Sequence, residues 1–146
     1  MKHLHFIGIG GIGMSGLAAM CKDHGFTVTG SDRDADHPEN ARIIDALRLQ
    51  KIEIYSTAIE ESNPDFLAGE GIPRLHRAEL LSQLVGELGF GNTVAVTGSC
   101  GKSTVTAYLA EALTNLGADP CCLNGALSKR FRGGRFAGNY RPGEKD

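Results

Sequence analysis

The sequence predicts an α/β protein built from two successive units of strands and helices, and three observations point to it. The segment "HFIGIGGIGMSG" joins an apolar, strand-like run to a helix-like run through a glycine-rich turn. The order strand, glycine turn, helix begins again near residue 93 with "TVAVTGSCGKST". The composition, 41% hydrophobic and 22% charged over 146 residues, allows one sizeable core.

The first unit, residues 1–88, has the pattern of a Rossmann-like domain with a parallel sheet. Residues 3–9 predict a strand, and apolar residues at helical spacing predict a helix from Ile12 to about His24, closed by Gly25. Residues 26–32 predict the next strand, which completes a βαβ unit with a right-handed crossover. The same signals predict the later elements: a helix starting near Pro38, a strand at 51–59, a short helix capped by Asn63, a strand at 72–76 and an amphipathic helix at 77–88.

One junction in this unit is unusually short. The helix that starts near Pro38 runs to about Gln50, and the next strand starts at Lys51, with no residue left for a loop. Connections from helix to strand usually take about 2 to 6 residues. We therefore expect either that the helix ends early or that a segment normally present here is absent.

The second unit, residues 93–146, follows a glycine-rich join at 89–92, the best candidate for a domain boundary. Residues 93–98 predict a β-branched strand, and residues 105–117 predict a helix that ends at Gly117. A short strand is expected within 119–127. This order predicts the start of a P-loop ATPase-type α/β domain.

The last segment, from residue 128 onwards, shows no periodicity and is rich in Gly and Arg. Phe131, Phe136 and Tyr140 stand between basic residues, a pattern that can indicate single-stranded nucleic acid binding. A single "RGG" is not an array, however, and we expect a solvated loop here.

Charge and cysteine usage restrict the classes of partner and compartment. The net charge of −2 gives no electrostatic reason to expect nucleic acid or an acidic membrane as a partner. No apolar run approaches the roughly 20 residues of a membrane span, and the N-terminus lacks the pattern of a signal peptide, so we expect a cytoplasmic protein. The four cysteines form no C-x-x-C pair and are expected to be buried or half-buried reduced thiols.

The first candidate site is the G-x-G-x-x-G pattern of residues 8–13. Gly8 allows the tight turn, Gly10 lets a diphosphate approach the backbone, and Gly13 lets helix and strand pack closely. The helix that follows supplies N–H groups and a partial positive charge. Asp32 ends the second predicted strand, near where an acidic residue meets a ribose in such folds. A dinucleotide such as NAD and a UDP-sugar both offer a diphosphate and a ribose, and the loop alone does not distinguish them.

The second candidate site is a shortened phosphate-binding loop of the form G-x-x-G-K-S, followed by Thr104. The strict pattern would need glycine where this chain has Val96. Its backbone N–H groups would surround phosphates, Lys102 would add a cation, and the Ser103 hydroxyl would reach Mg²⁺. The residues expected to surround the phosphates are Gly98, Ser99, Cys100, Gly101, Lys102, Ser103 and Thr104, and the family resemblance described below implies that these phosphates belong to ATP. A second phosphate site about 90 residues after the first favours a substrate site over a cofactor site at the first loop, and an NAD-dependent dehydrogenase would leave the second loop unexplained.

These two loops, in this order, resemble the Mur ligase family. The segments "HFIGIGGIGMSGLA", "SDRD", "STAIEESNPDF", "IPRLHRAELL" and "VAVTGSCGKSTVTAYLAEAL" follow in the family's order, over about residues 3–128. The glycine loop is most similar to members that join L-alanine to UDP-N-acetylmuramate. Other members attach a whole peptide in cell-wall recycling, and a non-catalytic nucleotide-binding module is a third interpretation.

The resemblance implies roles for individual residues. The first domain would hold UDP-N-acetylmuramate, with Gly10, Gly11 and Ile12 presenting backbone to its diphosphate and with Asp32 and the Ser56–Thr57 turn near the nucleotide. In the second domain, Lys102 would be the catalytic residue and contact the β- and γ-phosphates of ATP, and Ser103 would hold Mg²⁺. The family transfers the γ-phosphate to the substrate carboxylate, and the amine of the incoming amino acid attacks the acyl phosphate.

The chain departs from the family's pattern in three ways. It has Gly98-Ser99-Cys100 where these ligases usually have Gly-Thr-His, and it lacks about 20 residues, an extra strand and helix, where Gln50 meets Lys51. The family's acidic motif for a second metal, a later histidine and the C-terminal domain have no counterpart. We therefore expect this chain alone to be inactive.

Overall fold

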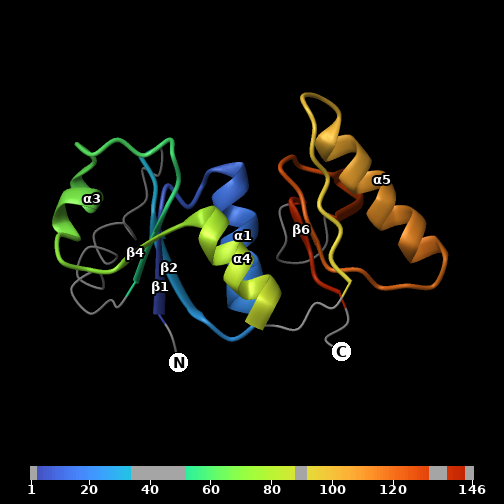
Figure 1. Ribbon diagram of the computed structural model, residues 1–146, viewed down its shortest axis with the longest axis horizontal. Helices are drawn as coiled ribbons and strands as arrows, with labels where there is room; N and C mark the ends of the chain where they lie inside the picture. Colours follow the sequence, from blue (N-terminus) through green and yellow to red (C-terminus); the bar gives the residue numbers. More distant parts are fainter. Residues whose placement is uncertain (1–2, 34–51, 88–91, 132–137, 144–146) are drawn as a thin grey trace.

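The computed structural model describes residues 3–33, 52–87, 92–131 and 138–143. Its main sheet contains four parallel strands in the order β2-β1-β3-β4 (Figure 1). Their bounds are β1 His3–Ile7, β2 Thr27–Ser31, β3 Ile52–Tyr55 and β4 Arg74–His76. The strands that the sequence predicts at 3–9, 26–32, 51–59 and 72–76 are confirmed, each shorter than expected.

Two helices cover one face of this sheet and bury the main core. Helix α1 spans Ile12–Asp23 and helix α4 spans Arg77–Glu87, and both lie on the same side of the sheet in Figure 1. β1 is buried on both faces along most of its length, as expected for a central parallel strand. Phe6 and Ile54 from the strands, Leu17 from α1 and Leu84 from α4 are among the side chains of this core.

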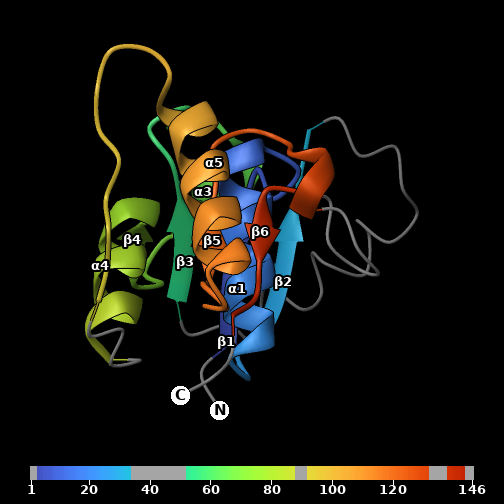
Figure 2. The ribbon, with the colours of Figure 1, turned by 90° about the vertical axis from the view of Figure 1, so that its right-hand side faces the viewer.

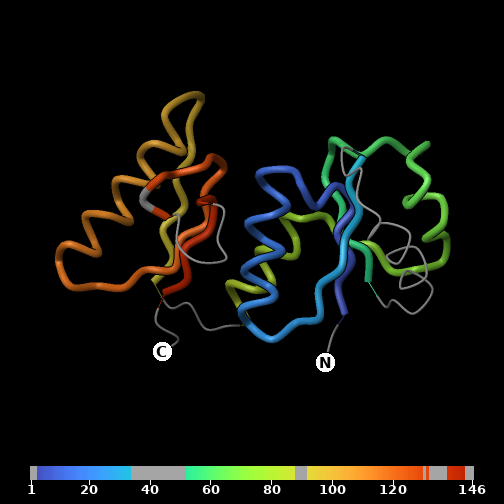
Figure 3. Tube along the Cα trace, turned by 180° about the vertical axis from the view of Figure 1, so that it is seen from behind, coloured from blue at the N-terminus to red at the C-terminus, as the bar shows by residue number. Residues whose placement is uncertain are grey.

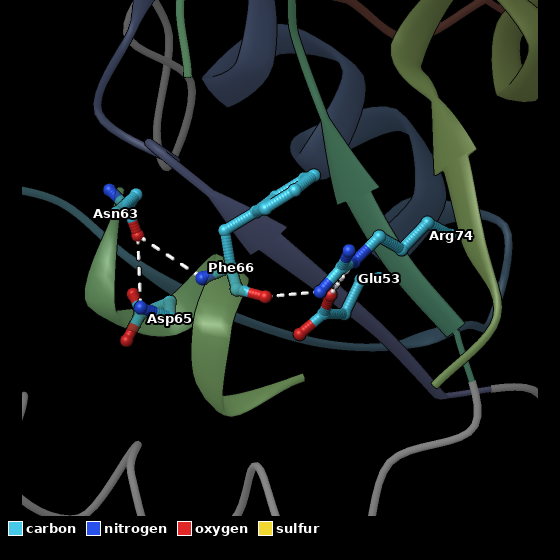
Figure 4. Close-up of polar contacts among 5 residues, drawn as sticks. All are labelled: Glu53, Asn63, Asp65, Phe66 and Arg74. Atoms are coloured by element: carbon cyan, nitrogen blue, oxygen red, sulfur yellow. Dashed lines mark hydrogen bonds and ion pairs between the residues drawn. The ribbon is translucent and has the colours of Figure 1, made fainter. Parts of the chain in front are cut away.

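The opposite face of the sheet buries polar side chains beneath α3 (Pro64–Ala68). Glu53 is fully buried, and its Oε2 accepts a hydrogen bond from Nε of Arg74 on the next strand at 2.8 Å. The Arg74 guanidinium also donates to the Phe66 carbonyl and lies 3.7 Å from the Phe66 ring centroid (Figure 4). Asn63 caps α3, as predicted, because its Oδ1 accepts from the N–H groups of Asp65 and Phe66 at 2.9 and 3.3 Å.

The second part of the chain is built around helix α5, Lys102–Asn115. A two-stranded antiparallel sheet of β5 (Cys122–Leu123) and β6 (Tyr140–Arg141) lies between α5 and α1, as Figures 2 and 3 show. A 3₁₀ turn, Lys129–Phe131, comes between these strands in the chain. Helix α1 therefore lies between the four-stranded sheet and the two-stranded one.

The prediction of a strand at residues 93–98 is wrong. These residues belong to neither sheet, and Val94 is 69% exposed. A β-branched run has strand propensity, but a strand forms only where neighbouring strands accept its backbone hydrogen bonds. In the described part of the chain, the two short strands of the second unit pair with each other and not with this segment.

The prediction of a solvated loop from residue 128 onwards is also wrong for several residues of this segment. Tyr140 is 1% exposed, Asn139 2% and Phe131 7%. Tyr140 and Asn139 pack against α1, which lies more than 115 residues earlier in the chain. Burial against a distant element leaves no periodicity in a short segment, so the local pattern could not reveal it.

Other predictions have mixed outcomes. Gly25 and Gly117 follow the last residues of α1 and α5 with positive φ angles of 84° and 87°, as expected for C-terminal glycines. The free cysteines are confirmed, but Cys100 is exposed rather than buried. The helix expected from Pro38, the junction of Gln50 with Lys51 and most of the join at 89–92 lie outside the described residues, and the domain limits 1–88 and 93–146 stay predictions.

Two further findings concern membranes and metals. Every helix in the described ranges is too short or too polar to cross a lipid bilayer. Across the same ranges, no three His, Cys, Asp or Glu side chains gather as a metal-binding group.

Candidate functional site

The glycine loop lies directly after β1 and is folded by backbone contacts. The N–H groups of Gly8 and Ile9 donate to the Ser31 carbonyl at the end of β2, at 2.8 and 2.9 Å. Gly8 has φ of +77°, a left-handed conformation that favours glycine. Gly11 is the N-cap of α1, without a side chain to cap it. The loop thus enters α1 with its backbone, not its side chains, facing the space above the helix.

The first turn of α1 offers hydrogen-bond donors to an anion. Ile12 and Gly13 open the helix, where helical geometry supplies no acceptor for their N–H groups. These donors, with the partial positive charge of the helix N-terminus, form the kind of site that holds phosphate. Ile12 is 45% exposed, so the first turn of α1 is accessible to solvent.

Asp32 lies at the glycine loop itself. Its Oδ2 accepts a hydrogen bond from the Gly10 N–H at 2.7 Å. A Cβ atom built on Gly10 would stand 2.8 Å from the same oxygen, so a glycine is needed for this approach. The structure therefore brings together two residues that the sequence assigned to one site.

Ser56 and Thr57 follow β3 at the same edge of the sheet, because carboxyl ends of parallel strands meet at one edge. Their turn is closed by a hydrogen bond from the Ile59 N–H to the Ser56 carbonyl at 3.0 Å. The Ile59 side chain lies beside Gly8, at 3.2 Å from where a Cβ atom would be. The turn is thus adjacent to the glycine loop, and its place near a nucleotide stays a prediction.

Arg77, at the start of α4, is a candidate residue that the sequence analysis missed. Its guanidinium lies where a side chain on Gly13 would begin. Arg77 is exposed, and among the described residues it has no ion-pair partner. A cation is the wrong charge for the N-terminus of a helix, so its contact with the first turn of α1 favours an anion bound beside both groups. A sequence signal for Arg77 existed, because it directly follows β4 and the carboxyl ends of the four parallel strands meet at one edge of the sheet.

The second loop, residues 98–101, leads into α5. Gly101 is the N-cap of α5 with φ of +77°, and Gly98 has φ of +148°. The Lys102 ammonium donates to the carbonyls of Gly98 at 2.5 Å and Ser99 at 3.2 Å. Lys102 thus lies across the loop, and phosphate oxygens would replace these carbonyls as its partners.

Ser103 and Thr104 lie in the first turn of α5, next to a hollow of about 320 Å³. The hollow also includes Tyr108 from α5, and Asn124 and Lys129 from the segment after β5. Asn124 Nδ2 donates to the Ser103 carbonyl at 3.2 Å. Gly125 lies opposite the Ser103 hydroxyl, and a Cβ atom built on Gly125 would be 3.6 Å from the hydroxyl oxygen. Cys100 is exposed at the tip of the loop, where the resemblance would place a histidine.

Comparison with known proteins assigns the family. Residues 3–87, more than half of the chain, match the family described as "Mur ligase family, catalytic domain". The chain belongs to the Mur ligase family. The matched residues include the glycine loop, Asp32, the Ser56–Thr57 turn and Arg77, and they end before the second loop.

Curated relatives of this Mur ligase chain extend over both loops. The UDP-N-acetylmuramate–L-alanine ligase of Agathobacter rectalis is 38% identical over 99% of this chain and 33% of its own length. The enzyme of the same name from Caulobacter vibrioides is 40% identical over 88% of this chain and 29% of its own length. The chain therefore spans about a third of the length of the curated relatives it matches.

Solved Mur ligases have the same fold over this part. The UDP-N-acetylmuramate–alanine ligase of Thermotoga maritima superposes with a TM-score of 0.79 at 26% identity, covering 98% of this chain and 35% of that chain. The UDP-N-acetylmuramate:L-alanyl-γ-D-glutamyl-meso-diaminopimelate ligase of Neisseria meningitides gives 0.75 at 26% identity, covering 97% and 46%.

The two loops of this Mur ligase chain therefore present two different sets of groups of the kind that phosphorylated ligands bind. The first combines N–H groups, a helix N-terminus and a guanidinium, which suits a diphosphate. The second combines a glycine-rich backbone, an ammonium and a hydroxyl in the first helical turn, which suits a nucleoside triphosphate with its divalent cation. Helices α1 and α5 both begin at the upper end of the molecule in Figures 1 and 3.

Proposed function

We propose that this chain is the N-terminal part of a cytoplasmic, ATP-dependent ligase that joins L-alanine to UDP-N-acetylmuramate in peptidoglycan precursor synthesis. The observation that carries the proposal is the presence of two differently built glycine loops in one chain, which lead into the first turns of α1 and α5. The names of the curated relatives support the choice of substrates.

In this proposal the first domain binds the UDP-sugar. Backbone groups of Gly10, Gly11 and Ile12 face its diphosphate, and Arg77 closes over it from α4. Asp32, which now accepts from the Gly10 N–H, would exchange that contact for the ribose hydroxyls. The turn of Ser56 and Thr57 borders the nucleotide, while Gly8 and Gly13 keep the loop close to the sheet and open to the ligand.

The second domain would bind ATP and Mg²⁺. Lys102 would leave the carbonyls of Gly98 and Ser99 and neutralise the β- and γ-phosphates, and Ser103 would hold the cation. A carboxylate oxygen of the UDP-sugar attacks the γ-phosphorus and ADP leaves. The alanine amine then attacks the acyl carbon, loses a proton and expels inorganic phosphate. The protein's contribution is to position these groups and neutralise their charge.

We further propose that the chain binds its ligands but does not turn them over alone, because it spans about a third of the length of its relatives. Isothermal titration of the 146-residue chain with UDP-N-acetylmuramate, with ATP and Mg²⁺, and with NADH tests the function. Saturable binding of the first two, without NADH binding, is expected. Micromolar binding of NADH without binding of UDP-N-acetylmuramate would contradict the proposal.

A peptide-joining activity is the second candidate, supported by the similarity to the Neisseria meningitides ligase. The two activities differ in the acceptor, so the full-length protein should be assayed for phosphate release with L-alanine and with the tripeptide L-alanyl-γ-D-glutamyl-meso-diaminopimelate. We expect turnover with L-alanine. Turnover with the tripeptide alone would assign the second activity.

A further inference from the structure

Two buried asparagines connect the first turns of the two phosphate-binding helices. Asn139 is 2% exposed, and its Nδ2 donates to the Ile12 carbonyl at 2.7 Å and to the Ser15 hydroxyl at 2.8 Å, both on α1. Asn124 is 4% exposed, and its Nδ2 donates to the Ser103 carbonyl on α5 at 3.2 Å.

The two asparagines are joined to each other through the backbone. The Asn124 N–H donates to the Asn139 carbonyl at 2.8 Å, beside the pairing of β5 with β6. The hydrogen bonds therefore run from Ile12 to Asn139, from Asn139 to Asn124 and from Asn124 to Ser103. Ile12 and Ser103 are both residues of the candidate sites, although they lie 91 positions apart in the chain.

Two features indicate that this connection is built for a specific geometry. Gly16 has no side chain, and a Cβ atom there would stand 3.1 Å from Asn139 Nδ2 and 2.9 Å from the Leu123 side chain. The Asn124 Oδ1 is buried with no hydrogen-bond partner in the described part of the chain, which costs free energy. An apolar residue would avoid that cost but would lose the contact to Ser103.

We propose that Asn139 and Asn124 are positioning residues that hold the helix of the UDP-sugar site against the helix of the ATP site. The inference rests on the function proposed above. Binding of a triphosphate requires Lys102 to leave the carbonyls of Gly98 and Ser99, which rearranges the loop one residue before Ser103. The hydrogen-bonded connection transmits this rearrangement to Ile12, so occupation of one site raises the affinity of the other.

Isothermal titration of the 146-residue chain measures this coupling. UDP-N-acetylmuramate is titrated with and without a saturating, non-hydrolysable ATP analogue and Mg²⁺. We expect the analogue to raise the affinity of the wild-type chain by about 5-fold or more. Asn139→Asp places a carboxylate oxygen against the Ile12 carbonyl, and we expect the effect of the analogue to fall below about 2-fold.

Tyr140→Phe is the matched control. Tyr140 is buried against the same helix, but its hydroxyl donates to Asp23 Oδ2 at 3.1 Å, at the opposite end of α1 from the glycine loop. The variant should lose a comparable contact between the same elements and keep the coupling. Asn124→Asp breaks the connection from the α5 side and should abolish coupling, so it tests the proposal even if Asn139→Asp does not fold.

The outcomes separate this inference from the proposed function. If the wild-type chain binds neither ligand, the proposed function fails, and the inference with it. If both ligands bind but show no coupling, or if either asparagine variant keeps the wild-type coupling, the positioning role is refuted. Equal loss in Tyr140→Phe would likewise overturn it, because the effect would then follow from general loosening of the contact.

Discussion

The guanidinium of Arg77 lies against Gly13 and takes the space in which a side chain on residue 13 would begin. This relationship places a cation from the start of α4 over the first turn of α1. Because the helix end already carries a partial positive charge, the arrangement becomes electrostatically favourable when an anion binds next to both the helix end and the guanidinium. The Arg77 guanidinium supplies a full positive charge, which the residues of the glycine loop do not carry.

Replacing Arg77 by Ala should weaken UDP-N-acetylmuramate binding about 10- to 100-fold, the loss expected for a hydrogen bond to a charged group. The midpoint of thermal unfolding should change little, because Arg77 is exposed. Titration calorimetry and a melting curve on the same sample measure both. Arg77→Lys keeps the charge but not the planar fork, and an intermediate affinity is expected. Unchanged affinity in Arg77→Ala would remove this residue from the site.

Lys102→Ala should reduce ATP affinity by about 100-fold or more, because the ammonium is the loop's cation. The fold should be retained, since Lys102 is exposed and the N-cap of α5 is Gly101, not Lys102. Lys22→Ala is the control, because it removes an exposed lysine from the last turn of α1, away from residues 98–104. If ATP binding survives in Lys102→Ala, residues 98–104 are not a phosphate-binding loop, and the interpretation as a ligase loses its second site.

Stability should fall in mild acid because of His5. This side chain is fully buried on β1, and burial lowers its pKa to about 4 from 6.5, with Asp65 opposing the shift and His3 adding to it. Between pH 6.5 and pH 4 the unfolded chain therefore takes up a proton that the folded chain does not. The free energy of unfolding should decrease over this window by up to about 3 kcal/mol.

Urea denaturation at several pH values between 7 and 4 measures that decrease. His5→Gln removes the titrating group, so the slope of stability against pH should be shallower in the variant, whatever its stability at pH 7. Equal slopes in the two proteins would show that acid sensitivity arises elsewhere.

The buried pair of Glu53 and Arg74 should show strong coupling. Glu53 has no exposed side-chain area, whereas the side chain of Arg74 is 28% exposed. Arg74→Ala leaves a buried carboxylate without its guanidinium and should lower the free energy of unfolding by about 3 kcal/mol. The same substitution made in a Glu53→Gln background should cost about 1 kcal/mol or less in addition, because no buried charge remains. Denaturation of the four proteins gives the cycle, and equal costs in both backgrounds would mean that the pair is not coupled.

The first site shows how far local signals reach. The Ser56–Thr57 turn follows only from the family resemblance, because the pattern of the residues predicts a strand through residue 59, whereas β3 ends at Tyr55 and Ile59 lies beside Gly8. Three glycines after a strand and an acid after the next strand are recognised in the sequence, and the structure places Asp32 on Gly10. These signals are local because each depends on the conformation of one strand end. Arg77 was not recognised, because its role depends on how α4 lies against α1 and not on its neighbours in sequence.

In the second unit, predictions made from local sequence patterns failed. Residues 93–98 have strand propensity but belong to no sheet in the described part of the chain, since pairing needs partners that propensity does not provide. Tyr140 and Asn139 were expected in solvent and are buried instead. In both cases the outcome was decided by the neighbours that the segment meets in three dimensions.

The sequence by itself determined the βαβ order, the helix ends at Gly25 and Gly117 and the two glycine loops, because turn chemistry and hydrophobic periodicity act over a few residues. The tertiary structure alone decided that Arg77 covers Gly13 and that Asn139 and Asn124 join Ile12 to Ser103. The contacts of Arg77 with Gly13, Asn139 with Ile12 and Asn124 with Ser103 connect positions from 21 to 127 residues apart. They depend on how whole helices pack, and contacts between residues so far apart in the sequence produce no periodic pattern in the chain.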